Sequence, residues 1–116
     1  MRYMLLIYSD ENGDEQKMSE AEMGRLMAEY GRFHEDIMAS GCFKGAERLR
    51  PSPMATTVRV RSGEVITTDG PFAETKEHLG GYYEIEVKDL DEAVAWAARI
   101  PTSTYGSIEI RPIWES

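Results

Sequence analysis

The opening run of the chain, residues 2–8, is apolar on both of its alternating sets. Successive side chains of a strand point to opposite faces of a sheet, so this run predicts a central strand that is covered on both faces. The two sets are Tyr3, Leu5 and Ile7 on one side and Met4, Leu6 and Tyr8 on the other. Each side of the sheet therefore needs a cover.

Residues 19–40 carry the clearest helix signal. Ser19 and Glu22 have the spacing of a capping box, and Gly41 stands where a left-handed residue commonly ends a helix. Apolar residues recur between them at steps of three and four, namely Met23, Leu26, Met27, Tyr30, Phe33, Ile37 and Met38. This stripe predicts a helix that covers one face of the sheet.

The rest of the chain alternates between extended segments and one more helix. Asp89 can cap a second helix that stops at Pro101. Extended segments are predicted over residues 44–50, 57–61, 64–68, 82–87 and 107–113, and the second and third of them read as a hairpin. This order predicts a single α+β domain over residues 1–116, with both helices on one face of an antiparallel sheet.

The second face of this sheet predicts a partner. Met4 and Leu6 are expected near its centre, and large apolar side chains lose about 1.5–3 kcal/mol each when they stay in water. We expect polar and aromatic residues to surround them, namely Arg59, Arg61, Tyr82, Glu84, Glu109 and Arg111. A homodimer that stacks two such faces would cover them and enclose a charged cleft for a small ligand.

Composition excludes several classes of partner. The chain has 13 Lys and Arg against 21 Asp and Glu, a formal charge of −8, which argues against binding to nucleic acid or an anionic membrane. The apolar run at residues 4–8 is far shorter than the roughly 18 residues of a membrane span. One cysteine and the lack of a signal-peptide pattern in the first twenty residues predict a cytoplasmic protein.

Several blocks of sequence resemble a known family. They are DGPFAETKE at residues 69–77, LGGYY at 79–83, DEAVAWA at 91–97 and IEIRPI at 108–113. Together and in this order they strongly resemble the DGPF subgroup of the YCII-related proteins. The resemblance implies a ferredoxin-like protomer that pairs into a dimeric α/β barrel.

The resemblance also suggests two kinds of activity. The wider family includes a chlorinated-hydroquinone dehydrochlorinase, with a His/Asp pair proposed as the shared active site. DGPF proteins are commonly encoded beside extracytoplasmic-function sigma factors, which suggests an accessory role instead. When Gly41 is aligned with the glycine that closes the first helix of shorter YCII-type sequences, their helical histidine falls nearer Tyr30 than His34.

His34 and Asp69 are the candidate catalytic residues. An imidazole changes its protonation near neutral pH, so His34 can act as a general base beside a carboxylate such as that of Asp69. The alternative reading makes His34 a histidine at the edge of the core. Asp69 is then a turn former, because Asp before Gly accepts hydrogen bonds from its own loop amides.

Four residues are candidates for substrate binding: Lys76, Arg111, Tyr82 and Arg59. The forked donors of Arg59 and Arg111 suit a carboxylate or phenolate, and Lys76 can hold an anion or pair with Asp69. Pairing of the arginines with acidic residues on neighbouring strands is the favoured alternative.

A metal site at Glu74 and His78 has only a weakly diagnostic spacing, and a hydrated charged loop is the favoured interpretation. We therefore expect no metal and no organic cofactor. The first functional hypothesis is a lyase or hydrolase that acts on an aromatic or phenolic compound by acid–base chemistry. The alternative is a non-catalytic module that senses a ligand or binds a sigma factor.

Overall fold

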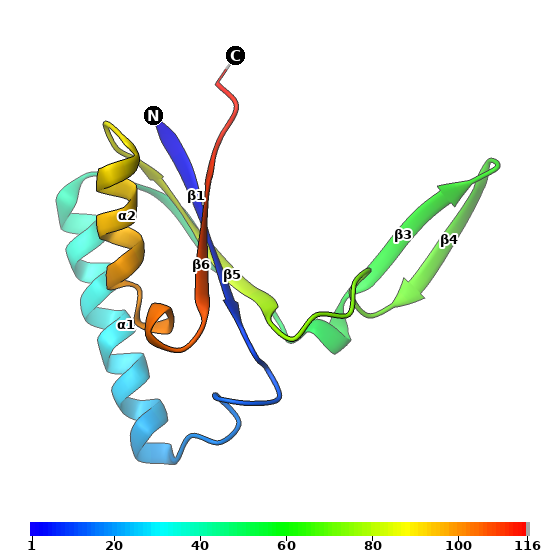
Figure 1. Ribbon diagram of the computed structural model, residues 1–116, viewed down its shortest axis with the longest axis horizontal. Coiled ribbons are helices and arrows are strands. Elements are labelled where there is room, and N and C mark those ends of the chain that lie inside the picture. Colours follow the sequence, from blue (N-terminus) through cyan, green and yellow to red (C-terminus); the bar gives the residue numbers. More distant parts are fainter. Residues whose placement is uncertain (116) are drawn as a thin grey trace.

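The computed structural model describes residues 1–115, and Figure 1 shows their arrangement. The elements, in chain order, are β1 (Arg2–Ser9), α1 (Glu20–Ser40), β2 (Phe43–Arg48), the 3-10 helix η1 (Ser52–Met54), β3 (Thr56–Arg61), β4 (Glu64–Asp69), β5 (His78–Glu86), α2 (Leu90–Arg99), the 3-10 helix η2 (Pro101–Thr104) and β6 (Ser107–Pro112). Within these residues, neither α-helix is long and apolar enough to cross a membrane.

Four strands form an antiparallel sheet in the order β2-β5-β1-β6, and both α-helices cover one of its faces (Figure 1). The predicted α+β class is confirmed, and the strand order is consistent with a ferredoxin-like sandwich. β1 is an inner strand, with Leu5 opposite Tyr83 on β5 and opposite Ile110 on β6. The uncovered side, which we call the open face, carries Met4 and Leu6 of the same strand.

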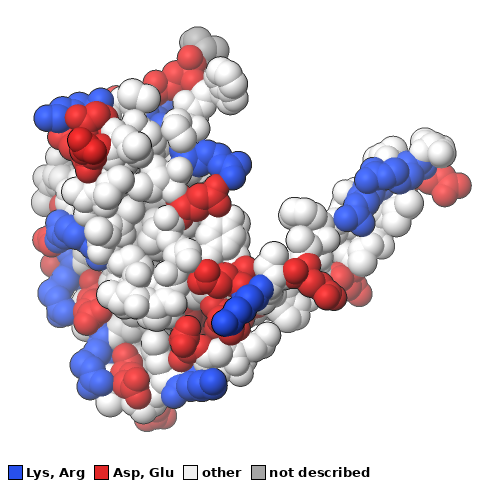
Figure 2. Space-filling model, viewed as in Figure 1, with Lys and Arg blue, Asp and Glu red and all other residues white. Residues whose placement is uncertain are grey.

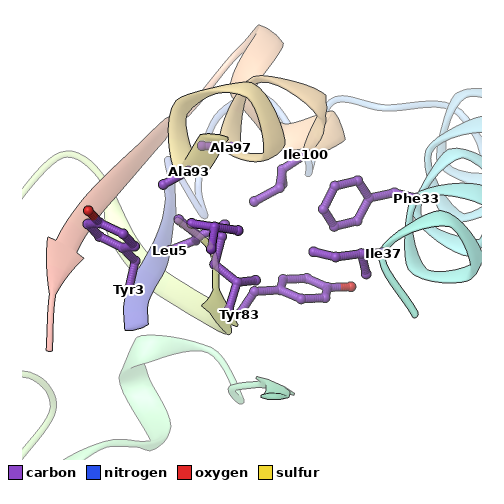
Figure 3. Close-up of a cluster of buried hydrophobic side chains, with 10 residues drawn as sticks. Tyr3, Leu5, Phe33, Ile37, Tyr83, Ala93, Ala97 and Ile100 are labelled. Atoms are coloured by element: carbon purple, nitrogen blue, oxygen red, sulfur yellow. The ribbon is translucent and has the colours of Figure 1, made fainter. Parts of the chain in front are cut away.

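The core lies between the sheet and the helices, as Figure 3 shows. Phe33 and Ile37 reach it from α1, and Ala93 and Ala97 reach it from α2. The ring of Phe33 meets the ring of Tyr83 edge to face, with 5.2 Å between centroids. The largest of the fully buried side chains are Leu5, Ile37, Ile85 and Ile100.

Both ends of α1 follow the predicted local chemistry. The Ser19 hydroxyl accepts a hydrogen bond from the Glu22 amide at 3.1 Å, and the Glu22 carboxylate accepts one from the Ser19 amide at 3.4 Å. Gly41 has a φ of 81°, a left-handed conformation that favours glycine. The predicted bounds of this helix are therefore close to the observed ones.

The hairpin β3–β4 differs from expectation, because it forms a sheet of its own and projects from the body of the molecule (Figure 1). The expectation that Arg59 and Arg61 lie on the open face is therefore wrong. Prolines precede and follow the hairpin. Because a proline has no amide proton to donate to a neighbouring strand, these residues interrupt sheet pairing and separate the hairpin from the strands of the body. The radius of gyration is 16.2 Å, against about 13 Å for a compact chain of this length.

The core arrangement predicts the effect of Ile85→Ala. Because Ile85 is fully buried, the substitution should lower the free energy of unfolding by about 2–5 kcal/mol, measured by urea denaturation followed by circular dichroism. Val94→Ala on α2 is the control, since about half of the Val94 side chain is exposed and alanine favours the helix. Equal losses in the two variants would contradict this placement of the core.

Candidate functional site

A cavity of about 420 Å³ lies between the first half of α1 and the helix-covered face of the sheet. Figure 1 shows that α1 and the sheet diverge toward the N-terminus of the helix. From α1 the lining residues are Met23, Leu26, Met27, Tyr30 and His34. The opposite wall includes strand residues with small side chains, which leave room for the cavity: Ala46, Gly80 and Gly81.

Gly81 is needed for this wall. A Cβ atom at this position would lie 2.6 Å from the carbonyl oxygen of Glu47 on β2. Because that neighbour is backbone, it cannot turn aside as a side chain would. A larger residue at position 81 would force β2 and β5 apart beside the cavity.

A chain of hydrogen bonds closes the cavity beside η2. The hydroxyl of Tyr30 bonds to the hydroxyl of the buried Thr102, whose oxygen lies 3.5 Å from the hydroxyl of Tyr105. Tyr105 donates to a carboxylate oxygen of Glu15 at 3.0 Å, and Ser9 donates to the same oxygen at 3.2 Å. These contacts join α1, η2, β1 and the loop after β1.

The phenols at the cavity stay protonated at neutral pH. Burial raises the pKa of Tyr30, an effect that its hydrogen bond to Thr102 partly opposes. Burial also raises the pKa of Tyr83, and burial together with Glu15 raises the pKa of Tyr105 to about 12. Tyr30 and Tyr83, which line the cavity, can therefore donate hydrogen bonds to a ligand.

His34 lies one turn after Tyr30, at the rim of the cavity. Its Nδ1 is 3.3 Å from the hydroxyl of Tyr83, and its ring meets Phe43 edge to face with 5.3 Å between centroids. The side chain remains exposed on its other side. Both helix positions considered from the sequence, 30 and 34, thus line one cavity.

Asp69 does not line this cavity. It ends β4 at the base of the hairpin, opposite Thr56, and is exposed. The structure of one chain therefore does not bring His34 and Asp69 together at the cavity.

Among the predicted substrate-binding residues, Tyr82 contributes to the cavity lining. Lys76 is exposed in the loop before β5, and Arg59 is exposed on the hairpin. Arg111 is exposed on β6 and forms an ion pair with Glu109, the structural pairing that the sequence analysis favoured. Within the described residues, Arg48 is the cation at the cavity.

His78 has a different neighbour from the one considered for a metal site. Its Nδ1 lies 3.7 Å from a carboxylate oxygen of Glu11, and Glu11 accepts hydrogen bonds from the amide and the hydroxyl of Ser52 at 2.8 and 2.6 Å. Residues 1–115 contain no cluster of three or more His, Cys, Asp or Glu side chains placed to hold a metal ion.

Sequence reasoning missed the polar side of the cavity. The sequence analysis assigned Tyr30 to the apolar stripe of α1. Its position four residues before His34, on the same helix face, was the available signal that its hydroxyl belongs to the site. Thr102 and Tyr105 gave no signal, because they meet residues of α1 and the first loop that lie 72 and 90 positions away.

Two comparisons with known proteins bear on this site. The YCII-related domain matches residues 1–116. An uncharacterised protein of Rhizobium meliloti (strain 1021) is 37% identical over 115 residues, which are 97% of this chain and 92% of that protein. Both matches include the residues that line the cavity.

The raised pKa of Tyr105 predicts a loss of stability in alkali. The folded chain holds this proton more tightly than the unfolded chain, so the stabilisation is complete below pH 10.0 and is lost as the pH rises toward about 12. Urea denaturation across this range should show the decline. Tyr105→Phe should reduce the decline, and Glu15→Gln should lower the pKa of Tyr105, measured by tyrosinate absorbance. A Tyr105 hydroxyl that ionises at its ordinary pKa would contradict the hydrogen-bond chain.

Proposed function

The chain belongs to the YCII-related family, and we propose that its cavity is the active site of a lyase or hydrolase for aromatic or phenolic compounds. One observation carries the proposal. An imidazole, that of His34, and a protonated phenol, that of Tyr30, line a largely apolar cavity from the same face of α1. A base and a hydrogen-bond donor around an apolar space suit acid–base chemistry on an aromatic ring.

His34 is the proposed general base. In one tautomer, Nδ1 carries the ring proton and donates a hydrogen bond to the Tyr83 oxygen. Nε2 is then free to accept a proton from the substrate. Tyr83 then positions the ring. Tyr30 would donate a hydrogen bond to the oxygen on which negative charge develops.

The charges at the cavity favour a neutral substrate over an anion. Two acidic residues, Glu11 and Glu15, line it together with Arg48. A phenol that enters neutral avoids repulsion from these carboxylates, and Arg48 is the candidate partner for charge that forms during the reaction. Lys76 and Arg111, proposed from the sequence as anion holders, lie outside the cavity of their own chain.

We also propose a homodimer that stacks open faces, supported by Met4 and Leu6 on a face that no part of residues 1–115 covers with a helix. The cleft between two such sheets was the ligand site expected from the sequence. We place the substrate on the other side of the sheet, beside α1, because the cavity lies there. Asp69 can assist His34 in this dimer only if a second copy brings it to the cavity rim.

A second candidate function is a non-catalytic accessory module. The observation that favours it is the exposed hairpin β3–β4, whose apolar side chains are available to a protein partner. A sigma factor is the partner suggested by resemblance to DGPF proteins. Co-purification of a neighbouring sigma factor with the chain, lost when the hairpin is removed, would support this function.

The enzyme proposal predicts the effect of His34→Gln. With a panel of phenols, chlorinated hydroquinones and phenyl esters, and with chromatography of the products, turnover should fall by about 10²–10⁴-fold. The matched control is Glu35→Gln, the next residue on α1, which is exposed and does not line the cavity. Unchanged turnover in His34→Gln, with an unchanged melting temperature, would exclude His34 as the base.

Asp69→Asn tests the predicted pairing separately. If Asp69 assists His34 from a second copy, the variant should lose turnover while its melting temperature and dimer content stay the same. Turnover equal to that of the unmodified chain would remove Asp69 from the mechanism and leave His34 in place. Binding of the panel without any turnover would instead favour the ligand-sensing module.

A further inference from the structure

Thr102 on η2 has a buried hydroxyl group that bonds to other side chains. The residue is 3% exposed, and within the described chain the hydrogen-bond partners of its hydroxyl are those of Tyr30 and Tyr105. The neighbouring hydroxyls of Ser103 and Thr104 donate to backbone carbonyls instead. Because a buried hydroxyl costs free energy unless it is paired, Thr102 helps to fix where the Tyr30 hydroxyl lies at the cavity.

The backbone at Thr102 is held in place. Its carbonyl oxygen accepts hydrogen bonds from the amides of Tyr105 at 3.2 Å and of Gly106 at 2.7 Å. A Cβ atom at position 106 would lie 2.2 Å from the carbonyl oxygen of Tyr8, so this segment packs closely against β1. With the side chain fixed in this way, rotation of the Thr102 O–H bond decides which partner receives its proton.

Glu15 sets the direction of the hydrogen bonds beyond Thr102. Figure 2 shows charged side chains spread over the surface of the body, whereas Glu15 is only partly exposed. One of its carboxylate oxygens accepts hydrogen bonds from Tyr105 at 3.0 Å and from Ser9 at 3.2 Å. Because Tyr105 has a single hydroxyl proton and gives it to Glu15, Tyr105 can only accept from Thr102.

Two arrangements of the remaining protons are then open. In the first, Tyr30 donates to Thr102 and Thr102 donates to Tyr105, so no proton of this chain of hydrogen bonds points into the cavity. In the second, Thr102 donates to Tyr30, which leaves the Tyr30 proton for a group in the cavity. Each hydroxyl keeps its own proton, and the two arrangements differ only in the rotation of O–H bonds.

The contacts favour an exchange between these arrangements. The oxygens of Thr102 and Tyr105 are 3.5 Å apart, well beyond the roughly 2.7–2.8 Å that is typical of hydroxyl pairs, so little is lost when this contact opens. The contact between the hydroxyls of Tyr30 and Thr102 is kept in both arrangements. A substrate oxygen that gains negative charge attracts the Tyr30 proton and therefore favours the second arrangement.

We infer that Thr102 is a positioning residue whose hydroxyl turns from Tyr105 to Tyr30 when negative charge forms on the substrate oxygen. Before that charge forms, Thr102 accepts the hydrogen bond of Tyr30. During the reaction it donates to Tyr30 and strengthens Tyr30 as a donor. This exchange, which we call the Thr102 switch, rests on the proposed function and adds to it the group that controls the hydrogen-bond donor.

Thr102→Val tests the switch in a double-mutant cycle with Tyr30→Phe. Valine keeps the branched shape without the hydroxyl, so turnover of the same panel should fall about tenfold, mainly in kcat, because the lost bond acts as charge forms. In the Tyr30→Phe chain the same substitution should change turnover by less than about twofold, since Thr102 acts through Tyr30. Thr102→Ser restores the hydroxyl and should recover most of the turnover. Thr104→Val is the control, because the Thr104 hydroxyl bonds to the backbone carbonyl of Pro101 and should not affect turnover.

A second measurement does not depend on turnover. The hydrogen bond to Thr102 partly opposes the effect of burial on the pKa of Tyr30, so Thr102→Val should raise this pKa. Tyr105→Phe should lower the pKa of Tyr30, because Thr102 then bonds to the Tyr30 phenolate without leaving another acceptor. NMR titration of chains with isotope-labelled tyrosine can follow both shifts, and the Tyr30 signal is the one that Tyr30→Phe removes.

Two results with Thr102→Val would overturn the switch and leave the proposed function in place: an unchanged pKa of Tyr30, or an equal loss of turnover with and without the Tyr30 hydroxyl. If Thr102→Val does not fold, Tyr105→Phe decides, and a pKa of Tyr30 that is unchanged or raised overturns the switch. If the unmodified chain converts no member of the panel, the proposed function falls and the switch falls with it.

Discussion

The position of β1 between β5 and β6 is the constraint on which the rest of the structure depends. Because β1 is an inner strand, its two sets of apolar side chains must both leave water, and one chain supplies a cover for only one set. The set with Leu5 lies under the helices and forms the core. The set with Leu6 leaves an open face, and the demand for its cover connects the fold to the proposed assembly.

Local signals predicted most of the body. The capping box at Ser19 and the left-handed Gly41 act within a few residues, so the sequence was sufficient to bound α1. The sheet followed from the alternation of its strands. The independence of the β3–β4 hairpin could not be predicted in this way, because period-two alternation states that a segment is a strand and not which sheet it joins. The flanking prolines Pro51, Pro53 and Pro71 mark the ends of strands, but the end of a strand does not state which sheet the next strand joins.

The candidate site was predicted less completely than the fold. His34 was identified from residue type and helix face, and it lies at the cavity. Tyr30, Thr102, Tyr105 and Glu15 were not, because each reads as ordinary until the chain closes and their hydroxyl and carboxyl groups meet across three elements. Asp69 shows the opposite difficulty: a motif can be prominent in the sequence while its carboxylate lies outside the cavity of its own chain.

The uneven attachment of α1 has a consequence for how molecules reach the cavity. Phe33 and Ile37 anchor the C-terminal half of this helix in the core, whereas Leu26 is the one buried residue of its N-terminal half in the described chain. The capping box stabilises that half from within, without packing. We therefore expect local opening of this half to cost less free energy than global unfolding, and such opening would expose the cavity while the core stays packed.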